Sequence, residues 1–170
     1  MKKWSIVCLT ACLLAACTGN DQPQRSPASR IEAGFFNGSW TYRSLLNDTA
    51  WQTDFDSLAF AAAIMDLQLA GKDSLTGMIH WNTTPVLQGL RISGHIYYND
   101  SVACYALTGT GDSALGTAGW QYDYQGYVVP HWSFGVNQAD VLVGSVARAK
   151  PHNGEPAGVV ASTYMVRRSR

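Results

Sequence analysis

Charged side chains are scarce in this sequence. Asp, Glu, Lys and Arg make up 14% of its 170 residues, well below the roughly 25% usual in soluble domains. The 12 basic residues are matched by 12 acidic ones, so the chain lacks the basic excess that nucleic-acid binding requires. Few charges together with 16 glycines are typical of short strands and tight turns, and they argue against a disordered chain or a long-helix protein.

Long apolar runs are also rare, and the clearest one stands at the N-terminus. Lys2 and Lys3 precede a mostly apolar stretch from Ser5 to Ala16. As a helix, this stretch would be about 18 Å long, which is too short for a bilayer core of roughly 30 Å. The pattern therefore predicts a signal peptide over residues 1–16 and not a lasting transmembrane helix.

Leu14-Ala15-Ala16-Cys17 resembles the lipobox of bacterial lipoproteins. The resemblance implies cleavage before Cys17 and attachment of acyl chains, such as palmitate, to that cysteine. Two or three chains anchor a protein firmly, whereas one chain holds only marginally. Thr18 follows the cysteine, where lipoproteins retained in the inner membrane usually have Asp, so the resemblance favours the cell outer membrane. The alternative is an ordinary secretory leader cut near the same alanines.

A short polar segment separates this cysteine from the rest of the chain. The 13 residues from Thr18 to Arg30 contain no apolar side chain larger than Ala or Pro. They predict a flexible tether within residues 17–34, with a reach of about 20 Å. After cleavage and acylation Cys104 is the only free cysteine, so no intramolecular disulfide is expected, and a buried apolar role is predicted for it.

Alternating apolar and polar residues dominate from Phe35 onward. This period-two pattern, interrupted by turn residues, predicts eight β-strands. The second segment is ambiguous, because its alanines suit a helix while Met65, Leu67 and Leu69 alternate as in a strand; we predict a strand. The eight segments are 39–46, 58–69, 75–81, 87–98, 102–108, 120–129, 141–149 and 159–167.

Eight consecutive strands with short connections favour an antiparallel up-and-down arrangement. An open sheet would leave two unpaired edges, and closure removes both. We therefore predict an all-β domain over residues 35–170, folded as an eight-stranded barrel, with a β-sandwich as the alternative. The interior of such a barrel either is filled by side chains or holds one small ligand.

Gly38-Ser39-Trp40 resembles the Gly-x-Trp motif of lipocalins and their calycin relatives. The resemblance implies that Trp40 packs across the closed end of the barrel beneath an arginine of the last strand, which would be Arg167 or Arg168. Leu75-Thr76-Gly77 and Val143-Gly144 are similar to the glycine pattern of avidin strands. The biotin-binding residues of avidin have no clear counterpart, so biotin is not implied.

The C-terminal third resembles a block found in uncharacterised bacterial exported proteins, for which no activity is established. The matching segments include 120–127, 130–132, 135–138, 143–146, 151–152 and 157–162.

Motifs that name an enzyme are not found. There is no Gly-x-Ser-x-Gly nucleophile elbow, and the glycine-rich loop 109–119 lacks the lysine of a phosphate-binding loop. His80, His95, His131 and His152 do not have the spacing of a helical zinc site, although strands could bring His80 and His95 together. The sequence therefore predicts no metal, no cofactor and no catalytic residue, and a protein that is not an enzyme.

A cluster of aromatic residues is the strongest candidate for a binding site. Aromatic rings with polar tips suit a pocket that is apolar inside and forms hydrogen bonds at its mouth, although ordinary core packing would use the same residues. The cluster consists of Trp120, Tyr122, Tyr124, Tyr127 and Trp132.

Two functions are compatible with these observations. The first is a lipid-anchored barrel in the cell envelope that binds a small apolar or aromatic ligand, or docks a partner at its open end. The second is a structural or envelope-interaction lipoprotein whose barrel is filled by side chains and has no ligand.

Overall fold

The computed structural model describes residues 31–50, 54–81 and 88–169. The predicted signal peptide, Cys17 and the tether up to Arg30 lie outside these residues. Within them, no helix is long and apolar enough to cross a membrane. The described elements are the short 3-10 helices η1 (Ala33–Phe36), η2 (Phe55–Leu58) and η3 (Ser113–Leu115) and the strands β1 (Gly38–Leu46), β2 (Ala59–Leu69), β3 (Ser74–Trp81), β4 (Gln88–Asn99), β5 (Val102–Gly111), β6 (Gln121–Val128), β7 (Val141–Arg148) and β8 (Val160–Arg167).

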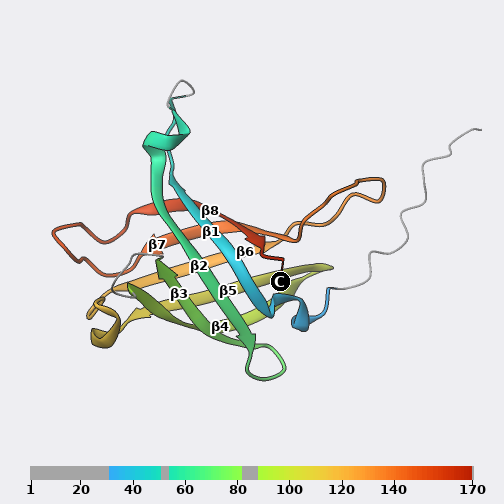
Figure 1. Ribbon diagram of the computed structural model, residues 1–170, viewed down its shortest axis with the longest axis horizontal. Helices are drawn as coiled ribbons and strands as arrows, with labels where there is room; N and C mark the ends of the chain where they lie inside the picture. Colours follow the sequence, from blue (N-terminus) through green and yellow to red (C-terminus); the bar gives the residue numbers. More distant parts are fainter. Residues whose placement is uncertain (1–30, 51–53, 82–87, 170) are drawn as a thin grey trace, which may run out of the picture.

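The eight strands form a closed barrel in which each strand pairs with the next along the chain (Figure 1). All pairs are antiparallel, and β8 pairs with β1, where Trp40 lies opposite Arg167. The sheet therefore has no free edge. This confirms the predicted up-and-down barrel and excludes the sandwich alternative.

The ambiguous second segment is the strand β2. Met65 and Leu67 are buried, and Asp66 between them faces outward on the pleat. Alternation along one strand places such neighbours on opposite faces of a sheet. The alternation of apolar and polar residues therefore predicted this segment correctly, whereas the helix propensity of its alanines would have predicted a helix.

The connections define two ends of the barrel. One end carries η1, the β2–β3, β4–β5 and β6–β7 connections and the end of β8, and we call it the closed end. The other carries η2, η3 and the β7–β8 connection, and we call it the open end. In Figure 1 the closed end lies to the right and the open end to the left.

Side chains fill the half of the barrel next to the closed end. They come from every strand and from η1, and their surfaces are almost wholly removed from water, as in an ordinary hydrophobic core. The largest of them are Phe36, Trp40, Met65, Leu67, Leu75, Tyr105, Leu142 and Met165.

Trp40 and Arg167 cover the closed end. The indole nitrogen of Trp40 donates a hydrogen bond to the carbonyl oxygen of Phe36 (3.1 Å). The guanidinium carbon of Arg167 lies 4.2 Å from the centre of the Trp40 ring and 4.8 Å from that of Phe35, within cation–π range. Its Nε donates to Asp140 at 2.6 Å. This is the arrangement that the calycin resemblance implied, with Arg167 in the role of the arginine.

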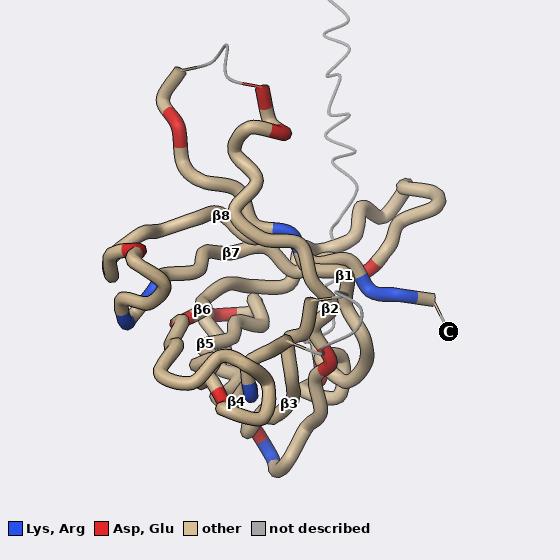
Figure 2. Tube along the Cα trace, turned by 60° about the vertical axis from the view of Figure 1, so that its left-hand side comes forward, with Lys and Arg blue, Asp and Glu red and all other residues tan. Residues whose placement is uncertain are grey.

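Two neighbours complete this cap. Gly38 has a φ of +135°, and a Cβ there would lie 2.9 Å from Nη1 of Arg167, so glycine leaves room for the guanidinium. Arg168 takes part only through its backbone N–H, which donates to the carbonyl oxygen of Ser39 (2.9 Å). Both arginines lie in the blue stretch before the C-terminus in Figure 2.

Candidate functional site

A cavity of about 270 Å³ occupies the open half of the barrel. Its floor is formed by Tyr42, Ile79, Tyr124 and Val146, and its walls and mouth carry further aromatic rings. The cavity is therefore mainly apolar, and side chains do not completely fill the interior of the barrel. The remaining lining residues are Phe60, Ala61, Trp81, Gln88, Trp120, Tyr122, Arg148 and His152.

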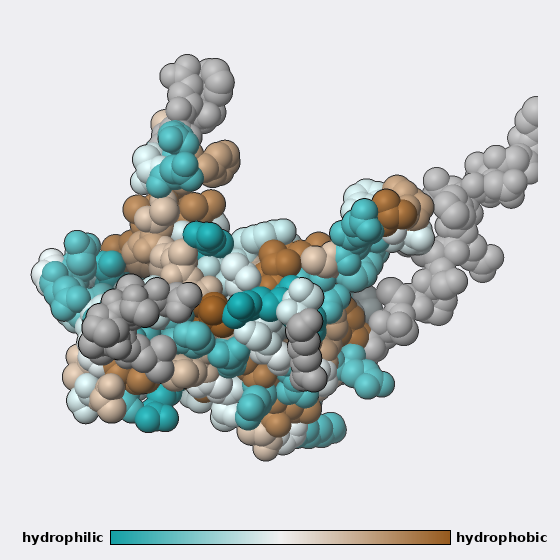
Figure 3. All heavy atoms as spheres, viewed as in Figure 1, coloured by the Kyte–Doolittle hydropathy of each residue, from teal (hydrophilic) through white to brown (hydrophobic). Residues whose placement is uncertain are grey.

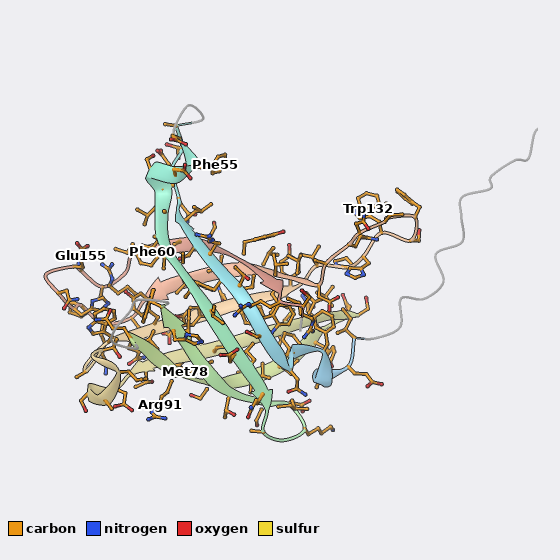
Figure 4. All side chains as sticks on the ribbon, viewed as in Figure 1. Phe55, Phe60, Met78, Arg91, Trp132 and Glu155 are labelled. Atoms are coloured by element: carbon orange, nitrogen blue, oxygen red, sulfur yellow. The ribbon has the colours of Figure 1, made fainter. Side chains whose placement is uncertain are left out.

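A β-bulge brings an additional ring to the cavity. Ser44 of β1 lies opposite Ala61, whereas Leu45 lies opposite Ala59, so Phe60 is the extra residue in β2. Such a bulge re-aims side chains by breaking the strict alternation of the strand. As a result both Phe60 and Ala61 line the cavity, and the Phe60 ring packs edge-on against Tyr122 at 6.3 Å. Phe60 is labelled on β2 in Figure 4.

Arg148 brings a positive charge to the mouth. Although it ends β7, its residue is only 6% exposed, because its side chain turns into the barrel. Nη1 donates to the carbonyl oxygen of Pro156 (3.0 Å) and to the carboxylate of Glu155 (3.3 Å). Burial lowers the pKa of Arg148, but its interactions with Tyr122 and Glu155 raise it more, so the net shift is upward. The guanidinium therefore stays charged.

The other described groups that line the cavity are neutral near pH 7. The described lining residues include no Asp or Glu, and burial raises the pKa of Tyr42 and of Tyr124 far above the physiological range. Arg148 is thus the one permanent charge among the described lining residues. A ligand that enters this site meets aromatic walls and a single cation near the opening.

His152 closes one side of the mouth. Its ring stacks on Trp120 with centres 4.0 Å apart and planes 5° apart. Its Nε2 lies 2.7 Å from the hydroxyl of Tyr122, and Nε of Arg148 lies 3.4 Å from the same hydroxyl. Because Arg148 can only donate, the Tyr122 oxygen accepts from it, and a hydrogen bond joins the same hydroxyl to Nε2 of His152. The ring of His152 is therefore held between Trp120 and Tyr122.

This geometry makes the mouth sensitive to acid. Burial lowers the pKa of His152 below its ordinary value, and Arg148 lowers it further, while Glu155 opposes the change. Because the pKa of His152 is lower in the folded chain than in the unfolded chain, the unfolded chain binds the proton more readily. The neutral histidine therefore contributes its full stabilisation of the fold above a pH of about 6.5, and this contribution is lost as the pH falls below that value.

We expect acidification from pH 7.5 to 5 to loosen the β7–β8 connection around His152. Hydrogen–deuterium exchange of residues 149–159, corrected for intrinsic rates, should show lower protection at pH 5. In a His152→Gln variant, which keeps an acceptor but cannot be protonated, the protection should change little with pH. An equal loss of protection in both proteins would rule out His152 as the cause.

The structure brings together three of the five predicted aromatic residues. Tyr122 and Tyr124 point into the barrel, and Trp120 lies at its mouth. Tyr127 is outside the cavity, because the alternation that turns residues 122 and 124 inward turns residue 127 outward. Trp132 is also outside, on the β6–β7 connection at the closed end. These two residues are therefore removed from the candidate site.

Sequence reasoning missed most of the other lining residues, among them Arg148, His152, Phe60 and Trp81. Arg148 had a signal, since it shares the parity of Leu142 and Val146 along β7. His152 had none, because its position depends on the path of the β7–β8 connection. His80 and His95 do not meet as considered above: His80 contacts Asp66 (3.1 Å), and the ring of His95 lies against Tyr97.

Comparisons of the chain with models of protein families, with curated proteins and with solved structures find no match.

Proposed function

We propose that this protein is a lipid-anchored barrel of the bacterial cell envelope that binds a small aromatic molecule carrying an anionic group. The observation that carries the proposal is the partly empty open half of the barrel, with aromatic walls and Arg148 as its permanent charge. The membrane attachment rests on the lipobox resemblance at Cys17.

The size of the cavity sets the size of the ligand. An apolar cavity of about 150 Å³ in another protein holds benzene, so a cavity of about 270 Å³ accommodates a molecule of about two fused rings. Trp81 and Trp120, whose rings meet edge-on at 6.1 Å, offer faces and edges against which such rings pack favourably.

The charge of the site sets the polar end of the ligand. Arg148 is buried, whereas its partner Glu155 is largely exposed. The two charged groups lie 3.3 Å apart. A carboxylate or sulfonate at the mouth would form charge-assisted hydrogen bonds with the guanidinium. The amide of Gln88 and the hydroxyl of Tyr122, which also line the cavity, would serve as further hydrogen-bonding groups.

Two matched compounds test the proposal. We expect 2-naphthoate to bind the chain from Thr18 onward, prepared without its lipid, at least about tenfold more tightly than 2-naphthalenemethanol, since a charged hydrogen bond contributes about 1.5–3 kcal/mol. Isothermal titration calorimetry measures both affinities. An Arg148→Met variant, shown to be folded by circular dichroism, should bind both compounds equally. Undetectable binding of both compounds to the unmodified chain would refute the proposal.

The second function considered, a side-chain-filled barrel that only docks an envelope partner, is less favoured because the open half contains the cavity. A catalytic role is not proposed, because among the described residues the side-chain hydrogen-bond partner of His152 is the Tyr122 phenol and not a carboxylate.

A further inference from the structure

The β6–β7 connection projects from the closed end and exposes three large apolar side chains. Trp132 is 68% exposed, Phe134 78% and Val136 83%; we call these three residues the apolar tip. The brown spheres on the right-hand projection of Figure 3 lie on this connection, and Trp132 is labelled at its end in Figure 4. Apolar side chains gathered so far from the core indicate a contact surface.

Local interactions hold the apolar tip in this exposed arrangement. The rings of Trp132 and Phe134 pack edge-on at 5.3 Å. The side chain of Gln138 accepts a hydrogen bond from the backbone N–H of Trp132 (2.7 Å) and donates one to its carbonyl oxygen (2.8 Å). These contacts brace the connection at the apolar tip itself, where both rings remain largely exposed.

The apolar tip lies at the same end of the barrel as the start of the described chain. Ile31 precedes η1, which packs at the closed end, and β6 ends and β7 begins there too. Thirteen residues separate Ile31 from Cys17, with an expected reach of about 20 Å. Acylation of Cys17 would thus keep this end of the barrel close to the bilayer.

The connection that carries the apolar tip has no permanently charged side chain. Residues 129–139 contain no Lys, Arg, Asp or Glu, and the projecting connection is tan in Figure 2. Asp140 at its base is paired with Arg167 and also lies 3.4 Å from Nε2 of His131. A neutral, aromatic surface with a tryptophan at its end is suited to the interfacial layer of a membrane, where tryptophan is enriched.

We propose that the apolar tip inserts into the interfacial layer of the membrane that holds the lipid of Cys17. The inference rests on the lipid anchor of the proposed function and is independent of the cavity. The short tether and the apolar tip then set the orientation together. The closed end faces the bilayer, and the open mouth with Arg148 faces away from it.

An environment-sensitive fluorophore on Ser133→Cys, in a Cys104→Ala background, tests the inference with the full lipidated chain. Mass spectrometry first establishes that Cys17 is acylated. In vesicles of neutral phosphatidylcholine we expect a blue-shifted emission that nitroxide-labelled lipid quenches.

The exposed phenylalanine at the other end of the barrel provides a matched control. Phe55 in η2 is 72% exposed and lies at the open end. Phe134→Gln should lower the ratio of inserted to free tip about tenfold, as expected for an apolar ring that no longer leaves water. Phe55→Gln should leave the quenching unchanged. Both substitutions are at exposed positions, so both variants are expected to fold.

Three outcomes would overturn the inference. An aqueous emission in vesicles, from an acylated chain, would show that the apolar tip stays in water while the anchor is correct. A blue shift without vesicles, in the chain from Thr18 onward that carries no lipid, would show that a second copy of the chain covers the tip. A Cys17 without acyl mass would remove the anchor and this arrangement together, and would leave the ligand cavity unaffected.

Discussion

Replacing Arg167 by alanine is expected to lower the free energy of unfolding by about 3 kcal/mol, which corresponds to a fall in Tm of roughly 10 °C for a domain of this size. The guanidinium forms hydrogen bonds with Asp140 and with the carbonyl oxygens of Asn37 and Phe35. It also covers the Trp40 ring at 4.2 Å. The expected loss lies at the lower end for a buried charge pair, because the side chain is 27% exposed.

Arg168→Ala is the matched control for this prediction. Its side chain is exposed, and its backbone hydrogen bond to Ser39 does not depend on the side chain. We expect a change below about 0.5 kcal/mol. Arg167→Lys should fall between the two, because lysine keeps the charge but lacks the planar fork. Equal melting temperatures for the two alanine variants would mean that the Trp40–Arg167 cap does not stabilise the closed end.

Filling the cavity should abolish ligand binding without unfolding the barrel. Ala61 lines the cavity on β2, and an Ala61→Phe side chain would occupy space that the ligand requires. We expect the affinity for 2-naphthoate to fall at least about 100-fold, since two rings no longer fit beside the new one. The apolar ring would enter a void and not a packed core, so Tm should change by no more than a few degrees.

The neighbouring alanine gives a control with the same substitution. Ala62 is exposed on the outer face of β2, opposite Arg43. An Ala62→Phe variant should therefore bind 2-naphthoate as the unmodified chain does. If Ala61→Phe retains full affinity, the ligand binds elsewhere and the cavity is not its site.

The strands of this fold could be predicted from sequence because the interior is apolar and the exterior polar along most of the chain. The alternation in β6 and β8 gives the strand type directly, and the turn between β4 and β5 was indicated by its polar residues. There Asp100 adopts a φ of 53°, a conformation that Asp tolerates better than most residues. Closure was predicted because an open sheet of eight strands would leave two unpaired edges.

The candidate site could be predicted only in part, for physical reasons that differ between residues. Neighbours in sequence alternate between the two faces, so the aromatic cluster splits, and Tyr127 points away from Tyr124. The bulge at Phe60 lies beside a run of alanines. Because these residues do not alternate between apolar and polar, the sequence gives no sign that the register shifts there. His152 reaches Trp120 only because its loop folds back through the bridge between His152 and Glu155.

The presence of a bound ligand deep in the barrel can be measured directly by nuclear Overhauser effects between 2-naphthoate and the protein. We predict contacts from the ring protons of the ligand to the methyl groups of Ile79 and Val146, which line the cavity. Contacts confined to the exposed rings of Trp132 and Phe134, or no contacts at all at saturating ligand, would contradict a binding site in the open half of the barrel.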